Sequence, residues 1–390
     1  MKSYKHLFAR ALAASPERIH FAAHSHHLWP DASYDGHLLA WQDAALLADR
    51  KWEKVFGEVI PEAQRHVADE LRLPDPQTLA FSANTHEFLT RIFVSKWNDR
   101  PIDVLTTDGE FHSFRRQGAR WEERGMIKRR IVPCEPFETF TERYLAAMRE
   151  QPPEIAFLSH VMFRTGLRFD GAEELASYAA AGGTWVVLDL YHSFMAMPCD
   201  FSKIADRMFL LGGGYKYAMA GENAAYLHAP PGYTPRPLHT GWFADFGAME
   251  GKQGEVAYGR DGSRFLGATY DPTGLYRFNA IRRMLAGEGL DTAAISTRCE
   301  TLRAQLVAAI EAGEAGGALR EAELLKPNAR GSQSRFISLR HPKAVEWKSR
   351  LMAENIVTDA RDDILRIGVA LYHDEADVGA FCAGVAKVLG

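Results

Sequence analysis

The chain has 390 residues, of which 46% are apolar and 25% charged, and its formal net charge is −4. This composition is that of a folded globular protein, which excludes a long disordered chain, and the slightly acidic balance provides no basic field for nucleic acid. A chain of this length exceeds what one hydrophobic core usually supports, so more than one domain is expected.

The N-terminal segment combines little continuous apolar character with a cluster of histidines. Residues 1–20 lack the apolar run of a signal sequence, and no run elsewhere reaches membrane-spanning length, so a cytoplasmic protein without membrane contact is expected. His20–Pro30 contains four histidines, but no cysteine or carboxylate accompanies them at a metal-ligand spacing. The pattern favours a segment beside the mouth of an active site, with His26 as a candidate substrate contact, and no metal site is predicted.

Helices and strands are predicted to alternate through the first two thirds of the chain. Apolar residues at helical spacing predict helices over Tyr34–Lys54 and Ile60–Leu71. From Leu79 onward, buried strands alternate with helices, which favours βαβ units and a mainly parallel sheet. The predicted strands are Leu79–Ser82, Asp103–Thr107, Glu154–Ser159, Trp185–Leu188, Met208–Leu211 and Asn223–His228, with helices over Glu87–Lys96 and Ala172–Ala181.

The pattern changes at Gly274 to helices separated by short strands, which predicts a second, α+β domain. The predicted elements are the helices Leu275–Leu285, Ile295–Ala312 and Ala344–Glu354 and the strands Arg335–Leu339 and Leu365–Val369. The expected organisation is an N-terminal segment (1–45), a large α/β domain (46–273) and a small C-terminal α+β domain (274–390).

Two neighbouring strand ends deliver an acid and a lysine. Asp189 and His192 follow the strand Trp185–Leu188, and Lys216 follows Met208–Leu211 after three glycines. Because ligands bind outside the carboxyl ends of strands in open α/β sheets, these groups should face one crevice. Pyridoxal phosphate chemistry uses such a pair, a lysine that forms a Schiff base and a carboxylate that faces the pyridinium nitrogen. Taken singly, a helix cap, a surface lysine and a flexible turn explain them as well; their combination favours the cofactor site.

Two further features suit the same cofactor. Asn84 and Thr85 stand at the start of a predicted helix, where free N–H groups and the helix dipole favour a phosphate. Either residue could equally be an N-cap, and both roles can hold together. Phe111 follows the next strand end and either stacks on a flat cofactor ring or fills the core.

In this order the motifs resemble the kynureninase-like members of the class V aminotransferase family, which are fold-type-I pyridoxal phosphate enzymes. The resemblance runs from about Leu79 to the C-terminus. It rests on the turn from Ser82 to Thr85, Phe111, Asp189-Leu190-Tyr191-His192, Tyr215-Lys216-Tyr217, Gly241-Trp242-Phe243, Arg330-Gly331-Ser332-Gln333 and the segment from Leu365 to Tyr372. It implies a large domain with a mainly parallel seven-stranded sheet and a smaller C-terminal α+β domain.

The resemblance also implies residue roles. The lysine would bind the cofactor, Asp189 and His192 would lie at its ring, and Tyr215 would contact its phosphate and act as acid or base. Arg366 would hold the substrate α-carboxylate, for which a planar guanidinium is suited. Further implied cofactor contacts are Asn84, Thr85, Phe111, Thr269 and Trp242, the last across a homodimer interface. Asp271, a candidate substrate contact, stands where the family has an asparagine.

The implied activity is hydrolytic Cβ–Cγ cleavage of a kynurenine-type amino acid to an anthranilate-type product and alanine, as in tryptophan catabolism. Another class V reaction is the alternative, either aminotransfer or C–S lyase or desulfurase chemistry. A desulfurase is disfavoured because the loop Leu324–Arg335 contains no cysteine, and the four scattered cysteines predict neither a zinc site nor a disulfide framework. A non-catalytic binding protein on the same fold is the alternative from another class.

Overall fold

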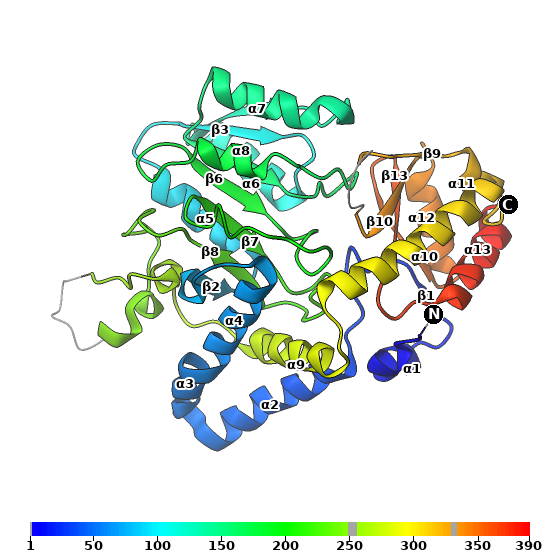
Figure 1. Ribbon diagram of the computed structural model, residues 1–390, viewed down its shortest axis with the longest axis horizontal. Helices are drawn as coiled ribbons and strands as arrows, with labels where there is room; N and C mark the ends of the chain where they lie inside the picture. Colours follow the sequence, from blue (N-terminus) through cyan, green and yellow to red (C-terminus); the bar gives the residue numbers. More distant parts are fainter. Residues whose placement is uncertain (1, 249–255, 329–333) are drawn as a thin grey trace.

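The largest sheet of the protein has seven strands. The computed structural model describes residues 2–248, 256–328 and 334–390 (Figure 1). The strand order is β2-β8-β7-β6-β5-β3-β4; the neighbours from β7 to β4 run parallel, and β8 is antiparallel to both β2 and β7. These strands are β2 (Leu79–Ser82), β3 (Ile102–Thr107), β4 (Ile127–Val132), β5 (Ile155–Ser159), β6 (Trp185–Asp189), β7 (Met208–Gly212) and β8 (Ala225–His228). The predicted mainly parallel sheet is confirmed.

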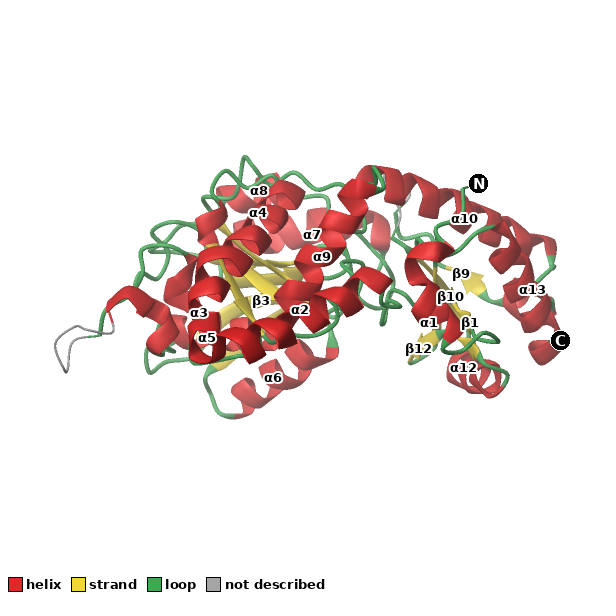
Figure 2. Ribbon diagram, turned by 90° about the horizontal axis from the view of Figure 1, so that it is seen from below, coloured by secondary structure: helices red, strands yellow, loops and turns green. Residues whose placement is uncertain are grey.

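Helices cover both faces of this sheet (Figure 2). Successive side chains of a strand point to opposite faces, so Ala156 and Leu158 of β5 join one apolar core while Ile155 and Phe157 join another. The helices α5 (Thr85–Lys96) and α6 (His112–Glu123) pack in the second of these cores. The first core is covered by α4 (Ile60–Leu71), α7 (Phe140–Glu150), α8 (Ala172–Ser177) and α9 (Thr273–Gly287), and α2 (Asp31–Leu47) lies against α9.

The C-terminal part forms a separate antiparallel sheet of four strands in the order β12-β13-β10-β9. The strands are β9 (Glu323–Leu324), β10 (Phe336–Arg340), β12 (Asp359–Arg361) and β13 (Ile364–Gly368), accompanied by α10 (Thr292–Ala312), α11 (Gly317–Glu321), α12 (Ala344–Ala353) and α13 (Glu375–Leu389). The N-terminal strand β1 (Ile19–His20) pairs in parallel with β11 (Ile356–Val357). Both chain termini therefore lie at this end of the molecule (Figure 1).

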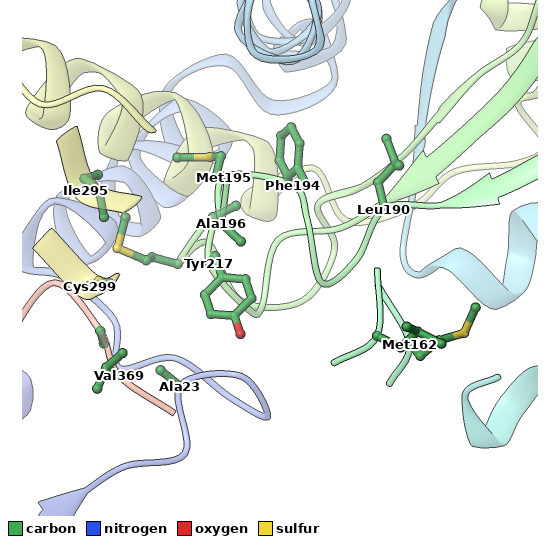
Figure 3. Packing of buried hydrophobic residues seen from close by; sticks show 14 of the residues in the cluster. Ala23, Met162, Leu190, Phe194, Met195, Ala196, Tyr217, Ile295, Cys299 and Val369 are labelled. Carbon is green, nitrogen blue, oxygen red and sulfur yellow. The ribbon is translucent and has the colours of Figure 1, made fainter. Parts of the chain in front are cut away.

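Four chain segments meet in one buried apolar cluster beside the sheet. Figure 3 shows Ala23 of the N-terminal segment, Tyr217 of the loop after β7, Cys299 of α10 and Val369, which follows β13. All four side chains are nearly inaccessible to solvent. Packing of Tyr217 in this cluster fixes the loop in which the preceding residue is Lys216.

Two predicted helices are shorter than expected. The helix predicted over Tyr34–Lys54 is wrong as one element, because α2 ends at Leu47 and Ala48 has a φ of 52° before α3 (Lys51–Lys54) begins. Asp43 accepts hydrogen bonds from side chains beyond this break, including one of 3.0 Å from a tyrosine of α9, and these contacts hold the turn.

The helix predicted over Ala172–Ala181 ends at Ser177, because Ala179 forms a bridge with Thr184 instead. The basic run Lys128-Arg129-Arg130 lies within β4. Among the described residues, no helix is long and apolar enough to span a bilayer.

Candidate functional site

A cavity of about 280 Å³ opens at the carboxyl ends of the central parallel strands. It brings together residues from both sheets and from the N-terminal segment. The predicted residues that line it are His26, Asn84, Thr85, Phe111, Asp189, His192, Tyr215, Lys216 and Arg366. Ser159, Phe163, Tyr191 and Arg361 line it as well, although the sequence did not single them out.

Lys216 lies on the floor of this cavity and is 6% exposed. Its Nζ donates a hydrogen bond to the His24 carbonyl (3.1 Å) and lies 3.2 Å from Nε2 of His192. Burial, helped by the nearby Arg366 charge and opposed by Asp189, lowers the pKa of Lys216 to about 7. A large fraction of this amine is therefore neutral near pH 7 and can act as a nucleophile or a base.

The glycines before Lys216 allow a close approach of neighbouring groups. A Cβ at Gly213 would lie 2.4 Å from Oη of Tyr191, closer than any side chain tolerates. Tyr191 in turn packs against Tyr215, with ring centroids 4.6 Å apart. The absence of a side chain at Gly213 therefore allows Tyr191 and Tyr215 to pack close to the turn that carries Lys216.

Asp189 ends β6, directly opposite Ser159 of β5 in the strand register. Its Oδ1 accepts a hydrogen bond from the backbone N–H of Tyr191 (2.8 Å). Burial raises the pKa of Asp189 to about 6, and that hydrogen bond and the Lys216 charge oppose the rise. Within the described parts of the chain no cationic side chain lies within ion-pairing distance of Asp189. The carboxyl can therefore accept a cationic partner from a ligand.

The N-terminus of α5 also lines the cavity. The Asn84 side chain accepts a hydrogen bond from the backbone N–H of Glu87 (3.1 Å), so this residue is an N-cap, as one of the two interpretations predicted. His86 also lines the cavity, and its buried Nδ1 has no hydrogen-bond partner among the described residues. Phe111 contacts Phe157 in the core at 6.3 Å between ring centroids and also borders the cavity, and its stacking on a cofactor ring stays a prediction.

Two arginines enter the cavity from one face of the small sheet. Arg366 of β13 pairs with Asp359 of β12 and donates to the Phe163 carbonyl, and its side chain is inaccessible to solvent. Arg361 of β12 donates to the other oxygen of the same carboxylate at 2.6 Å. The Nε atoms of both arginines are buried without a hydrogen-bond partner in the described structure. One carboxylate between two guanidinium groups leaves a net positive charge, which suits an anionic ligand.

Three predicted site residues do not line this cavity. Trp242 is 42% exposed at the surface, and Thr269 is exposed as well, so their cofactor contacts, including the one predicted across a dimer interface, stay predictions. Asp271 accepts hydrogen bonds from the backbone N–H of Thr273 at the start of α9 (2.9 Å) and from the Asn223 side chain (3.1 Å). Asp271 thus holds the turn that leads into α9, and its predicted substrate contact stays a prediction. The element Arg330-Gly331-Ser332-Gln333 lies outside the described residues.

The residues that sequence reasoning missed gave weak local signals. Ser159 ends a predicted strand, the same signal that identified Asp189. Arg361 precedes Arg366 by five positions, and its proximity depends on an antiparallel turn that the sequence pattern did not predict. Tyr191 lies between Asp189 and His192, which were both predicted as site residues, and this position was the signal that could have identified it.

None of the four cysteines borders the cavity in the described structure. Burial raises the pKa of the Cys134 thiol and raises that of Cys199 to about 12, so neither is activated as a thiolate.

Comparison with known proteins identifies the fold. Residues 295–384 match the model of the kynureninase C-terminal domain, and no curated protein matches the chain. A solved complex of the cystine C–S lyase C-DES with its reaction product cysteine persulfide is similar over 98% of this chain and 99% of that chain, with a TM-score of 0.79 and 16% identity. The protein therefore has the same fold as this lyase.

Two cysteine desulfurases share this fold with the chain. The enzyme from Thermococcus onnurineus NA1 has a TM-score of 0.77 at 17% identity, covering 99% of this chain and 98% of that chain. The enzyme CsdA from Escherichia coli has a TM-score of 0.74 at 16% identity, covering 98% and 97%. The predicted fold class is confirmed over nearly the whole chain, whereas the likeness to kynureninase in sequence is confined to the C-terminal part.

Proposed function

We propose that the protein is a pyridoxal phosphate enzyme that acts on an amino acid. The observation that carries this proposal is the meeting of two groups in one cavity, the buried Lys216 amine and the buried Asp189 carboxyl. A related solved structure of C-DES, at 16% identity, has its glycine ligand linked to a pyridoxal phosphate cofactor. When bound, this cofactor supplies an electron sink for negative charge that develops on the amino acid.

The residues of the cavity fit each part of this cofactor. Lys216 provides the amine for a covalent link, and Asp189 provides a carboxylate for a protonated ring nitrogen. The α5 N-terminus, capped by Asn84, provides N–H groups and a positive dipole end for the phosphate, with the unpartnered His86 Nδ1 beside it. Phe111 offers an aromatic face for the ring.

The remaining groups suit an amino-acid substrate. Arg366 lines the cavity, its Nε has no hydrogen-bond partner among the described residues, and its guanidinium is held by Asp359, so it is the candidate group for the α-carboxylate. The neutral amine of Lys216 is the base for the α-proton of the substrate, because its pKa is lowered to about 7. His192 lies 3.2 Å from that amine and can take part in moving the proton.

For the bond that is broken, C–S cleavage of a small cysteine-type amino acid is the first candidate. The cavity of about 280 Å³ is at the small end for ligand sites and has to hold cofactor and substrate together. The similar structures are a cystine C–S lyase and cysteine desulfurases. Because no cysteine borders the cavity in the described residues, β-elimination, which releases thiol or persulfide, pyruvate and ammonia, fits better than sulfur transfer to the protein.

Kynureninase-like hydrolysis is the second candidate, because residues 295–384, which include Arg361 and Arg366, match the kynureninase C-terminal domain. Tyr215 at the cavity would be the proton donor in that reaction.

Absorption spectroscopy tests the cofactor assignment. The protein incubated with pyridoxal phosphate should gain a visible absorbance band that sodium borohydride removes by fixing the cofactor to Lys216. A Lys216→Ala protein should lack the fixed cofactor, whereas Lys203→Ala, which removes an exposed lysine, should retain it. Fixation that persists in Lys216→Ala would refute the assignment.

Product analysis then separates the reactions. L-cystine and L-cysteine should yield pyruvate and ammonia if the site is a C–S lyase. L-kynurenine and 3-hydroxykynurenine should yield an anthranilate and alanine if it is kynureninase-like, and a keto acid derived from the amino donor would indicate aminotransfer. A cofactor-loaded protein with no turnover and no spectral change with any amino acid would favour the binding protein.

A further inference from the structure

Glu110 is a buried carboxyl below the cavity that the proposed reaction does not use. It is 1% exposed and follows the turn at the end of β3. Its Oε1 accepts hydrogen bonds from Oγ1 of Thr107 (2.6 Å) and from the backbone N–H of Ser159 (3.1 Å). Its Oε2 lies 2.6 Å from Oγ of Ser159. All its short contacts are thus with neutral groups.

Ser159 connects this carboxyl to the cavity. It is the last residue of β5, lies opposite Asp189 in the register and lines the cavity itself. A serine hydroxyl has one proton to donate and lone pairs to accept with. If the Ser159 hydroxyl donates its proton to Oε2 of Glu110, only its lone pairs remain for a ligand in the cavity. If it accepts a proton from Oε2, its own proton remains for the ligand.

The surroundings of Glu110 favour its neutral form. The titratable groups that face it are Asp189 of β6, Cys134 after β4 and Tyr144 of α7, and none of them is a cation. Burial raises the pKa of Glu110 to about 7, the hydrogen bonds from Ser159 and Thr107 oppose the rise, and the Asp189 charge adds to it. Glu110 therefore gains and loses its proton near neutral pH.

We propose that Glu110 is a positioning residue that sets the direction of the Ser159 hydroxyl. When Glu110 is protonated, its Oε2–H donates to Oγ of Ser159, and the serine proton turns into the cavity. When Glu110 loses that proton to solvent, Ser159 donates to the carboxylate and presents only lone pairs to the cavity. The site thereby changes from offering a donor to offering an acceptor beside Asp189.

The consequence for the cofactor rests on the proposed function. A ring with an ionisable oxygen, such as that of pyridoxal phosphate, is stabilised as an anion by a donor and destabilised by an acceptor. Its visible absorbance should therefore respond to the proton on Glu110.

The test is a pH titration of the full-length protein loaded with pyridoxal phosphate, with visible and infrared absorbance recorded on the same samples. In the native protein, the infrared band of a buried carboxylic acid should disappear over the same pH interval as a shift in the visible band. Glu110→Gln keeps the donor geometry, because its amide N–H replaces the carboxylic O–H, and should lose both transitions. Ser159→Ala should keep the infrared transition and lose the visible one.

Two results would overturn the inference: a visible transition that is unchanged in Glu110→Gln and Ser159→Ala, or an infrared signature of ionised Glu110 throughout the titration. Either result leaves the cofactor band in place and so leaves the proposed function standing. A protein without any cofactor band, but with a carboxylic-acid band that Glu110→Gln removes, would instead refute the proposed function and retain the buried proton on Glu110.

Discussion

Replacing Glu110 by glutamine should remove a pH-dependent loss of folding stability. In the unfolded chain this carboxyl ionises near its usual pKa of 4.5, whereas in the fold it retains its proton up to about pH 7. The folded state therefore binds the proton more tightly, and its advantage is complete below pH 4.5 and lost as the pH rises to about 7. At about 1.4 kcal/mol for each unit of pKa, the loss amounts to about 3 kcal/mol.

Urea unfolding at several pH values between 4.5 and 8 measures this effect. The glutamine side chain can accept from Thr107 and from the Ser159 N–H and can donate to Ser159 Oγ, so the contacts are kept. The free energy of unfolding of Glu110→Gln relative to the native protein should rise by about 3 kcal/mol over that range. Glu150→Gln, which changes an exposed glutamate at the end of α7, should show no such rise.

A difference between native protein and Glu110→Gln that stays constant from pH 4.5 to 8 would refute the reasoning. It would mean that Glu110 ionises at the same pH in the folded and unfolded states. The burial of this carboxyl among neutral partners would then not raise its pKa.

Three further predictions concern the lysine, the packing of α2 and the arginine pair. Acylation of Lys216 by an amine-selective reagent, followed by mass spectrometry of the peptide, should accelerate up to about pH 7 and then level off; a midpoint near 10.5 would contradict the lowered pKa. Gly36→Ala should destabilise the fold by about 1–3 kcal/mol in urea unfolding, because a Cβ there would lie 2.7 Å from a backbone carbonyl of α9. Gly57→Ala, where a Cβ meets nothing within 4 Å, is the matched control, and equal losses would refute the packing argument. Arg366→Gln should cost about 1–3 kcal/mol, because it removes one of the two guanidinium partners of the buried Asp359 and leaves Arg361 as the other; adding Asp359→Asn should recover stability but not amino-acid binding measured by titration, and recovery of both would contradict the ligand role of the arginine.

The parts of the fold that local pattern predicted are those with strong apolar runs. Strands such as Trp185–Asp189 are buried along their whole length, so their composition reports the structure directly. The strand Ile127–Val132 was missed because Lys128, Arg129 and Arg130 interrupt its apolar pattern. In the structure it pairs in parallel with β3, and Arg130 pairs with Asp103 of that strand. A window of neighbouring residues cannot contain such partners.

Some residues of the candidate site could likewise be found from the local sequence pattern, and others could not. Asp189, Lys216 and Asn84 could be found because each stands at or shortly after the end of a strand, and these strands end at one edge of the sheet. Asp271 was named as a substrate contact by resemblance alone, and that contact stays a prediction. Its hydrogen bond with the backbone N–H of Thr273 needs only residues that are neighbours in the sequence.

The sequence by itself determined the order of strands and helices, and with it the polar residues at the carboxyl edge of the sheet. The tertiary structure decided the chemical state of those residues. The pKa of Lys216 is lowered because distant segments bury it beside Arg366, and the pKa of Glu110 is raised because β3, β5 and β6 enclose it near Asp189. Burial and charge at such a point are sums over groups far apart in the chain, so they exist only once the chain has folded.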